Sequence, residues 1–374
     1  MSCRTEGSQK NVIIATIALN NMAGGVERNV VRLANALDAR GYKVHLISFD
    51  LPNAQSFFDV SENVVRYECG VSKPHEKISF FMRLKLLFNV RKAIASASLG
   101  TPIIVFHHGI LLRIFAAKFG LGNSVICSER HALSIYAHTS NTQKSLNFQL
   151  LRCCKAITVQ FPRYMRDYPS FLRSKITAIG NPVKASLQKA KPGEVGDDGR
   201  YKLLCVARLG YQKNVLLLIQ AFFELVEDFS LWDLHILGEG EERHSLETFI
   251  QEHDLQGRVF LHGQVSDPQA HYHSAHLFCL PSKWEGFPNA LAEAMSAGLP
   301  AVGLRSCDGV NDLIVHDKTG LLIDDEVSLS TALLLLMKDH DMRVAMGYRA
   351  AEFIQEYEPD QIYDQWCRLI GKFQ

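Results

Sequence analysis

The chain has 374 residues, of which 47% are apolar, and a formal net charge of +1. This length exceeds the usual size of one compact core, so two α/β domains are expected. No apolar run reaches the ~18 residues that a membrane-spanning helix requires, and residues 1–10 lack the apolar centre of a secretory signal, so a cytosolic protein is expected. The nine cysteines lack paired CxxC spacing, which indicates reduced, mostly buried thiols rather than disulfides or zinc ligands.

The two halves of the chain carry opposite charge. Residues 1–190 contain 25 Lys and Arg against 10 Asp and Glu, a balance of +15, which leaves 15 against 29, or −14, in the remainder. A strongly basic half attracts phosphate groups, nucleic acid or an anionic membrane leaflet, and the sign of the charge does not choose among these partners.

Strand-like apolar runs alternate with helical patterns from the start of the chain, which is typical of parallel βαβ units. Apolar positions between Val26 and Ala39 recur at helical spacing, and this helix ends before Gly41. The strands expected in the first half are Val12–Leu19, Val44–Phe49, Val64–Tyr67, Ile103–Phe106, Val125–Cys127, Ala156–Val159 and Ile176–Ile179.

A second alternating series follows a stretch rich in glycine and proline, residues 191–200, which is interpreted as a linker. The simplest arrangement is two doubly wound domains facing each other across a cleft, with ligands at the carboxyl ends of the strands. The expected domains are 1–185 and 186–355, and residues 356–374 form a C-terminal helix that packs back on the first domain. The strands expected in the second half are Leu203–Ala207, Asp233–Leu237, Val259–Leu261, Leu277–Leu280, Ala301–Val302 and Leu321–Ile323, and a helical stretch of about 342–373 ends the chain.

Two acidic residues flank the loop that follows the expected strand Leu277–Leu280. Glu285 precedes a Gly-Phe-Pro sequence, and Glu293 lies within the helix that begins at Pro288 or Asn289. Backbone N–H groups at a helix start bind anionic oxygens, so a pyrophosphate fits there. A carboxylate on either side can then accept hydrogen bonds from sugar hydroxyls. The alternative is a surface loop with two solvated acids.

Two cations stand five residues apart after the expected strand Leu203–Ala207. Arg208 and Lys213 flank a glycine turn, where they can clamp a diphosphate and compensate the charge that grows as a leaving group departs. The alternative is an ordinary basic loop between a strand and a helix. Another loop, residues 20–28, contains Gly24 and Gly25, and a lone glycine pair marks a tight turn more often than a ligand site.

These motifs, in this order, resemble those of the retaining GT-B glycosyltransferases of family four, the group one glycosyltransferases. The resemblance covers nearly the whole chain and implies two Rossmann-like domains, an N-terminal acceptor domain that faces the membrane and a C-terminal nucleotide-sugar donor domain. It rests on Gly24-Gly25-Val26-Glu27-Arg28, on Arg208 through Lys213, on Leu237-Gly238-Glu239-Gly240-Glu241-Glu242, on the E-x7-E element from Glu285 to Glu293, and on the following Ala297-Gly298-Leu299-Pro300.

The resemblance also implies roles for individual residues. Arg208 and Lys213 would hold the donor diphosphate and, with Glu285 at the donor sugar, form the catalytic group; Glu293 would bind the ribose hydroxyls. Such enzymes need neither a metal nor another cofactor, because the cations take the place of the metal. The other implied donor-binding positions are Gly24 and Gly25, which leave room for the diphosphate, the backbone of Phe287, Pro288, Asn289 and Ala290, and the main chain near Val265 at the base.

On the acceptor side, many relatives carry a histidine after a strand of the N-terminal domain. The comparable loop here contains Glu129, Arg130 and His131, and which of these aligns the acceptor stays open. Arg28 and His108 complete the expected acceptor residues. In a further departure, Asp312 stands where the family has a glutamate.

Two patterns imitate metal sites. The sequence Asp339-His340-Asp341 is a literal DxD, but it lies in the late helical region, where a turn before a helix is the expected structure. The histidines at positions 262, 271, 273 and 276 lack regular zinc-ligand spacing, so structural or solvated roles are expected for them. No metal site is therefore predicted.

The segment from Lys77 to Lys92 mixes large apolar and basic residues within the basic half. On a helix Phe80, Leu84 and Phe88 share a face with Leu87, flanked by lysine and arginine, a pattern that suits an interfacial helix on an anionic leaflet as well as ordinary core packing. We therefore expect a peripheral enzyme on the inner face of the cytoplasmic membrane.

The resemblance thus implies a retaining, metal-independent hexosyl- or N-acetylhexosaminyltransferase. It would move a sugar from a nucleotide-sugar, with UDP favoured, to a glycan or a polyprenyl-diphosphate-linked sugar in polysaccharide or lipopolysaccharide assembly. The alternatives are a GT-B sugar-nucleotide epimerase or phosphorylase, and a non-catalytic nucleotide-sugar binder. Nucleic acid is not an expected partner, because no recognised binding motif is present.

Overall fold

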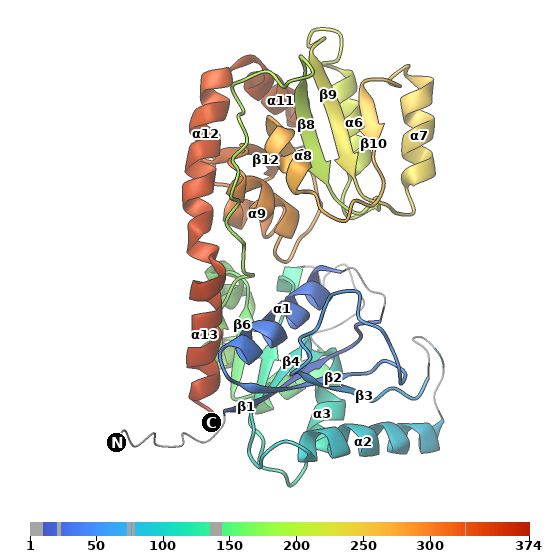
Figure 1. The fold of residues 1–374 in the computed structure, drawn as a ribbon, viewed down its shortest axis with the longest axis vertical. Helices are drawn as coiled ribbons and strands as arrows, with labels where there is room; N and C mark the ends of the chain where they lie inside the picture. Colours follow the sequence, from blue (N-terminus) through green and yellow to red (C-terminus); the bar gives the residue numbers. More distant parts are fainter. Residues whose placement is uncertain (1–9, 21–23, 73–75, 77–78, 135–143, 326) are drawn as a thin grey trace. The chain divides into compact units, whose positions relative to one another are not determined.

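The computed structural model describes residues 10–20, 24–72, 76, 79–134, 144–325 and 327–374 (Figure 1). The chain divides into two compact units. The first unit consists of Met1–Pro182 together with Asp360–Gln374, and the second of Val183–Pro359. Each unit is built on one parallel β sheet with helices packed against it (Figure 1).

The sheet of the first unit has seven parallel strands in the order β3-β2-β1-β4-β5-β6-β7. Its central strands are near-continuous apolar runs, as parallel strands covered on both faces must be, and β4 is buried at every position. The strand bounds are β1 Asn11–Thr16, β2 Lys43–Ser48, β3 Val65–Glu68, β4 Ile103–Phe106, β5 Val125–Ser128, β6 Ala156–Val159 and β7 Ile176–Ala178.

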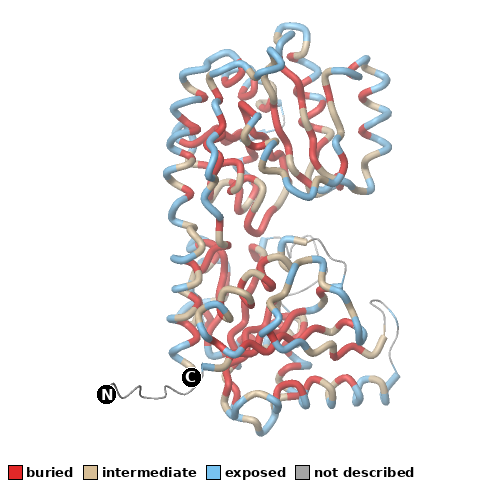
Figure 2. The backbone as a smooth tube through the Cα atoms, in the orientation of Figure 1, coloured by how far each residue is buried: buried red, intermediate tan, exposed pale blue. Residues whose placement is uncertain are grey.

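The sheet of the second unit has six parallel strands in the order β10-β9-β8-β11-β12-β13. The strand bounds are β8 Tyr201–Val206, β9 Trp232–Leu237, β10 Val259–Leu261, β11 Leu277–Leu280, β12 Ala301–Leu304 and β13 Gly320–Ile323. Every strand expected from the sequence is present in the two sheets, with its ends shifted by at most three residues. Buried segments concentrate along the strands in both units (Figure 2).

Helices connect the strands of each sheet. The helices of the first unit are α1 Gly25–Ala39, α2 Phe80–Ala95, η1 His108–Ile110, α3 Leu111–Ala117, α4 Leu146–Gln149, η4 Leu150–Cys153, η5 Pro162–Asp167, α5 Ser170–Arg173 and α13 Pro359–Gly371. Those of the second unit are α6 Val215–Phe223, α7 Arg243–Glu252, α8 Gln269–Ser274, α9 Asn289–Ser296, α10 Val310–Leu313, α11 Ser328–Lys338, α12 His340–Phe353 and η6 Ile354–Tyr357. Within the described residues, no helix is both long and apolar enough to cross a membrane.

The boundaries between the units lie a few residues from the expected ones, at 182/183 rather than 185/186 and at 359/360 rather than 355/356. Residues just after Pro182 already bond within the second unit. The N–H of Val183 donates to the carbonyl of Tyr357 at 2.8 Å, and that of Ser186 donates to Oγ of Ser296 at 2.9 Å. These long-range bonds, which no local pattern encodes, move the first boundary.

The stretch of residues 191–200 is not an interdomain linker, contrary to the sequence interpretation. It lies inside the second unit, where the carbonyl of Pro192 accepts a 2.7 Å hydrogen bond from Nε of the buried Arg343. The guanidinium also lies 5.1 Å from the ring centroids of Tyr201 and Trp232. A mostly exposed loop rich in glycine and proline is therefore anchored to the second unit through its buried Pro192.

The C-terminal helix α13 belongs to the first unit (Figure 1). The ring of Trp366 stacks on Phe106 of β4 with 6.4 Å between centroids, and Arg40 at the end of α1 donates to Asp360 at 2.6 Å. The late helical stretch predicted as about 342–373 is interrupted before Pro359, which opens α13, a position where proline suits a helix. The C-terminal helix thus returns to the first unit, as expected.

The strand order of each sheet reverses once, which determines where loops gather. In the first sheet β1 and β4 are neighbours although their connections leave in opposite directions, and β8 and β11 play the same part in the second sheet. Loops that follow the two strands at such a switch point diverge and leave a crevice at the carboxyl ends, where α/β proteins bind ligands. Gly24, His108, Arg208 and Glu285 follow these four strands.

Candidate active site

Three loops lie together at the carboxyl edge of the second sheet, following the neighbouring strands β9, β8 and β11. The N–H of Leu209 donates to the carbonyl of Glu239 at 2.9 Å, and the N–H of Glu242 returns a bond to the carbonyl of Leu209 at 3.0 Å. Glycine is required here, because a Cβ on Gly238 would stand 1.9 Å from the carbonyl oxygen of Ala207. The glycines of the 237–242 turn thus let it lie against the loop that carries Arg208.

Lys213 and Glu285 meet at this edge. Nζ of Lys213 lies 2.5 Å from Oε1 of Glu285, with 21% and 8% of their side chains exposed. Lys213 ends the loop after β8, and Glu285 lies in the loop after β11, so the ion pair joins the two sequence motifs. Arg208, on the same loop as Lys213, is exposed to solvent. A cation and a carboxylate therefore stand together with a second cation nearby in the chain.

Gln212 links the same two loops. Its carbonyl accepts a hydrogen bond from the N–H of Lys283 at 2.9 Å, and its side-chain Nε2 donates to the carbonyl of Trp284 at 2.7 Å. Neither Gln212 nor Trp284 is among the site residues predicted from the sequence. The only sequence sign was their position, since each directly precedes one member of the ion pair.

Helix α9 begins immediately after the loop of Glu285. Pro288 stands at its N-cap without a side-chain hydrogen bond, so the first-turn amides of Asn289 and Ala290 have no cap from this residue. The ring of Phe287 is buried and packs edge-on against Tyr357, 5.3 Å between centroids, which leaves only its backbone for a ligand. One turn into α9, Oε2 of Glu293 accepts a 3.3 Å bond from the hydroxyl of Tyr272.

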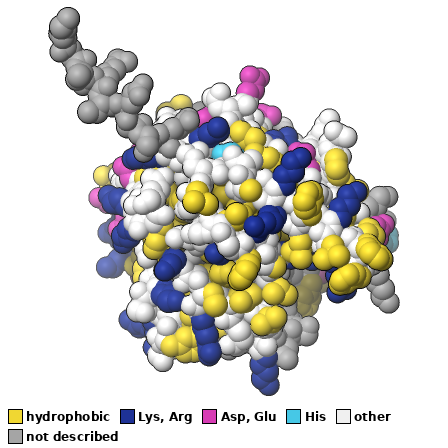
Figure 3. All heavy atoms as spheres, turned by 90° about the horizontal axis from the view of Figure 1, so that it is seen from below, with side chains coloured by type: hydrophobic (Ala, Val, Ile, Leu, Met, Phe, Trp, Pro, Cys, Tyr) yellow, Lys and Arg dark blue, Asp and Glu magenta, His cyan; other side chains and the backbone are white. Residues whose placement is uncertain are grey.

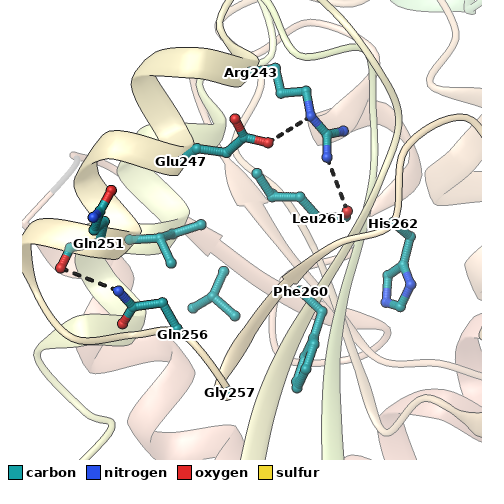
Figure 4. Close-up of a pocket in the computed structure, with 10 residues that line it drawn as sticks. Arg243, Glu247, Gln251, Gln256, Gly257, Phe260, Leu261 and His262 are labelled. Carbon is teal, nitrogen blue, oxygen red and sulfur yellow. Dashed lines mark hydrogen bonds and ion pairs between the residues drawn. The ribbon is translucent and has the colours of Figure 1, made fainter.

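Val265 lies in the loop after β10, half-buried. This loop is tied to the others through Gly263, whose carbonyl accepts a 2.8 Å bond from the N–H of Gly238. A groove of about 620 Å³ opens between α7 and β10 (Figure 4), and none of the expected donor-binding residues lines it. Arg243 of this groove bonds Glu247 at 2.8 Å and the carbonyl of Leu261 at 3.5 Å, so the guanidinium is already paired with residues of the protein.

In the first unit the loop after β1 and the start of α1 carry Gly24, Gly25 and Arg28. Gly24 is the N-cap residue of α1, and Gly25 is exposed. Asp50 fixes the loop from the end of β2, because Oδ2 accepts a 2.7 Å bond from the N–H of Leu19. Arg28 is half-buried in the first turn of α1. The Asn21, Met22 and Ala23 part of this predicted loop lies outside the described residues.

His108 and Glu129 follow the neighbouring strands β4 and β5 and form a buried pair. Oε2 of Glu129 lies 2.9 Å from Nδ1 of His108, and Oε1 accepts the N–H of His108 at 2.8 Å and Sγ of Cys127 at 3.2 Å. Burial alone raises the pKa of Glu129, but its bonds and charge interactions with His108, His107 and Cys127 outweigh this and lower the pKa to about 2. The carboxylate is therefore ionised and fully buried.

His107 extends this cluster. Its ring stacks on His108 with 4.4 Å between centroids, its Nδ1 accepts the N–H of Gly109 at 3.0 Å, and its φ of +77° is one that residues other than glycine rarely adopt. Burial lowers the pKa of His107. Among the described residues, His107, His108 and Glu129 are the one group of potential metal ligands, and both carboxylate oxygens already accept hydrogen bonds.

Arg130 and His131 differ in exposure. Arg130 is buried, bonds Asn181 through Nη2 and Ser128 Oγ through Nη1 at 3.3 Å, and lies over Phe106 at 5.4 Å from the ring centroid. Burial lowers its pKa to about 10. His131 is half-buried, with its ring centroid 6.5 Å from that of His107. Of the three residues left open for the acceptor, only His131 is partly exposed.

Residues of the two sequence patterns that resemble metal sites form contacts within the protein. Oδ1 of Asp339 caps α12 by accepting the N–H of Met342 at 2.8 Å, as expected for a turn before a helix. His276 is buried, accepts the N–H of Lys202 at 2.9 Å, and has its pKa lowered to about 4, chiefly by burial. His273 bonds Oγ of Ser186 at 2.8 Å. In the part of the chain that the structure describes, eight cysteines are free and six of them are buried, which confirms the expectation for those residues.

The amino-acid sequence is similar to those of known proteins. The family model "Glycosyl transferases group 1" matches residues 188–353, nearly all of the second unit. An "Uncharacterized glycosyltransferase" of Haemophilus influenzae is 26% identical over 350 residues, 93% of this chain and 96% of that protein. A Campylobacter jejuni protein named "GalNAc-alpha-(1->4)-GalNAc-alpha-(1->3)-diNAcBac-PP-undecaprenol alpha-1,4-N-acetyl-D-galactosaminyltransferase" is 28% identical over 376 residues, 96% of this chain and 97% of that protein.

Solved structures share the fold across both units. HepE of Anabaena in complex with UDP and glucose has a TM-score of 0.78 at 17% identity, covering 96% of this chain and 99% of that chain. The lipopolysaccharide outer core galactosyltransferase WaaB has a TM-score of 0.75 at 18% identity, covering 97% of this chain and 99% of that chain. Two Rossmann-like units of this kind define the GT-B class of fold. Residues 188–353 match the family of group 1 glycosyl transferases, and nearly the whole chain is similar to proteins named as glycosyltransferases.

Proposed function

We propose that this glycosyltransferase moves a sugar from a UDP-sugar to a polyprenyl-diphosphate-linked saccharide or a growing glycan, with retention of anomeric configuration and without a metal. The observation that carries the proposal is the meeting of Lys213 and Glu285 beside the N-terminus of α9. A cation, a carboxylate and a helix N-terminus are together suited to a diphosphate that carries a sugar.

In the donor arrangement we propose, Lys213 and the exposed Arg208 contact the diphosphate. Both cations would stabilise the negative charge that develops on the leaving nucleotide, which is the task that a metal performs in other transferases. Glu285 would accept hydrogen bonds from the donor sugar, and Glu293, already bonded to the hydroxyl of Tyr272, would accept those of the ribose. The backbone of residues 287–290 would meet the phosphate oxygens, and the main chain near Val265 would meet the base.

The choice of UDP is supported by relatives rather than by this chain alone. HepE of Anabaena, which shares the fold, is described in complex with UDP, with UDP and glucose, and with UDP-glucose. For the acceptor, the name of the Campylobacter jejuni relative specifies a saccharide on undecaprenyl diphosphate. A second Campylobacter jejuni relative, 26% identical over 348 residues, is also named for a diphospho-undecaprenol acceptor.

Retention requires the new bond to form on the face that the nucleotide leaves. In the proposed mechanism the leaving phosphate takes the proton of the acceptor hydroxyl on that face, so the protein supplies charge stabilisation and alignment rather than a dedicated base. On the acceptor side we propose that His131, the partly exposed member of its loop, aligns the acceptor hydroxyl. Arg28 is proposed as a second acceptor-binding residue. Glu129 and His108 are both buried, and we propose that they support this loop from beneath.

The donor can be identified by thermal unfolding in the presence of UDP, GDP and their sugars, because a ligand that binds only the folded state raises the melting temperature. We expect UDP and one UDP-sugar to raise it and GDP to leave it unchanged. The anomeric configuration of the product, read by NMR from the coupling constant of the new linkage, tests retention. Stabilisation by GDP alone, or an inverted product, would refute the corresponding part of the proposal.

We also propose that the enzyme works at the surface of an anionic membrane, through helix α2. The large apolar side chains Phe80, Phe81, Leu84 and Phe88 are exposed on this helix, Phe81 at 80%, whereas only Leu86, Val90, Ala93 and Ile94 are buried. Arg83, Lys85 and Lys92 lie on the same helix. Figure 3, which views the molecule from the side of α2, shows apolar side chains gathered there with lysine and arginine between them. Lys77 and Ile78 of the predicted segment lie outside the described residues.

A further inference from the structure

The loops that carry Lys213 and Glu285 run side by side for three residues. The ring of Tyr211 lies 6.0 Å from that of Trp284, and Nζ of Lys283 lies 3.6 Å from the centroid of Tyr211. One residue further along, Gln212 holds Lys283 and Trp284 through its carbonyl and its side chain. The next residue, Lys213, reaches Glu285. The ion pair therefore continues a series of contacts between the two loops.

Within this series Gln212 makes the polar contacts closest to the ion pair. Its Nε2 donates to the carbonyl of Trp284 at 2.7 Å, one residue before Glu285, while Gln212 itself is one residue before Lys213. The outer contact is weaker, because Tyr211 is 63% exposed and a cation over an exposed ring contributes little. The side-chain amide is thus the group placed to set the distance between the two loops.

Fixing that distance matters because Glu285 is buried. A carboxylate with 8% of its side chain exposed needs a partner, and Lys213 must remain beside it while staying able to turn to another anion. A loop displacement of about 1 Å can cost a hundredfold in rate when the displaced group handles the reacting molecule. A neutral amide can hold the loops together without competing for either charge.

We infer that Gln212 is a positioning residue: its amide fixes the loop after β8 to the loop after β11 and so places Lys213 against Glu285 before a donor binds. The inference rests on the proposed function for the roles of Lys213 and Glu285 in transfer. The placement itself is independent of those roles and can be measured without any donor.

The test is the rate at which an amine-acylating reagent labels Lys213, followed by mass spectrometry on the full chain. A lysine ammonium group that is paired with a carboxylate reacts more slowly with the reagent. Glu285→Gln removes this carboxylate, so its labelling rate is the reference for an unpaired Lys213. Gln212→Met keeps the side-chain length and removes the donor, and we expect it to speed labelling about three- to tenfold, the range for loss of one hydrogen bond. The matched control is Gln220→Ala, an exposed glutamine of α6 in the same unit, and it should label at the wild-type rate.

Adding UDP separates the inference from the proposed function. If Lys213 binds the donor diphosphate, UDP protects it from the reagent in the wild type, and less so in Gln212→Met. Labelling of Gln212→Met at the wild-type rate, with Glu285→Gln accelerated, would overturn the role of Gln212 and leave the proposed function intact. Faster labelling in Gln212→Met without protection by UDP in any variant would support Gln212 and count against the proposed function.

Melting curves guard against a purely structural effect. Gln212→Met and Gln212→Ala should both melt within a few degrees of the wild type, since one net hydrogen bond is lost. Failure of both variants to fold, with Gln220→Ala folded, would overturn the inference as well, because Gln212 would then maintain the unit as a whole rather than the spacing of one ion pair.

Discussion

Lys213 and Glu285 stand 72 positions apart in the sequence, yet Nζ of the first lies 2.5 Å from Oε1 of the second. The strands that precede them, β8 and β11, are neighbours at the switch point of the second sheet. The loops after neighbouring parallel strands emerge at the same edge, so the topology brings the two motifs together. This ion pair is the structural basis of the proposed donor site.

Removing either proposed phosphate cation should slow transfer. We expect Lys213→Ala and Arg208→Ala each to lower turnover by about 10²–10³, the scale for losing one preorganised charge-stabilising group. Turnover can be followed by release of UDP. Lys318→Ala, which removes an exposed lysine from a turn of the same unit, is the control and should retain wild-type turnover. Losses below threefold in both test variants would contradict the assignment.

The stability of the second unit should reveal the ion pair independently of catalysis. Lys213→Ala leaves the buried carboxylate of Glu285 without its cation, and we expect a loss of about 1–3 kcal/mol in the free energy of unfolding. Adding Glu285→Gln should restore part of that loss, because a neutral amide is less costly to bury than a charge. Denaturant unfolding of the two single variants and the double variant gives the coupling energy. Strictly additive effects would show that the pair does not form in solution.

The pH dependence of stability should report the His108 and Glu129 pair. The pKa of Glu129 lies at about 2 in the folded chain, below its ordinary value of 4.5. A lowered folded-state pKa stabilises the fold above about pH 4.5, and this contribution is lost as the pH falls from 4.5 towards 2. Its full size is up to about 3 kcal/mol.

Glu129→Gln isolates this contribution, since it keeps the shape and removes the titrating group. We expect the wild type to be more stable than the variant at neutral pH and the difference to shrink on acidification below about pH 4.5. Unfolding of both proteins by urea at a series of pH values measures the difference. A difference that stays constant across this range would mean that Glu129 is not ionised in the fold.

Membrane binding should depend on the exposed apolar face of α2. We expect the wild type to sediment with vesicles that contain anionic lipid, and binding to fall steeply with added salt, since basic residues contribute about 1 kcal/mol each near such a surface. Phe81→Ser with Phe88→Ser should weaken this binding at least tenfold. Tyr348→Ser, which removes an equally exposed aromatic residue from α12, is the control. Equal binding by the test variant and the control would reject α2 as the contact.

Much of the fold follows from local sequence patterns. Strands β4, β6, β10 and β11 have the predicted ends, because buried parallel strands are short apolar runs, bounded here by polar residues or proline. The same alternation of strands and helices predicts that loops following the strands share one edge. For this reason the sequence alone predicts that the loops of Lys213 and Glu285 share one edge, and the two side chains do meet there.

The amino-acid sequence by itself determined the strands, the two-unit organisation and the motif residues, because hydrophobic periodicity and glycine placement act over a few residues. Only the tertiary structure decided that Val183 already bonds in the second unit, that Glu129 is buried beneath its loop, and that Gln212 joins two distant loops. These are matters of long-range packing. A side chain's burial and its distant hydrogen-bond partners depend on which elements cover it, and no local pattern records that.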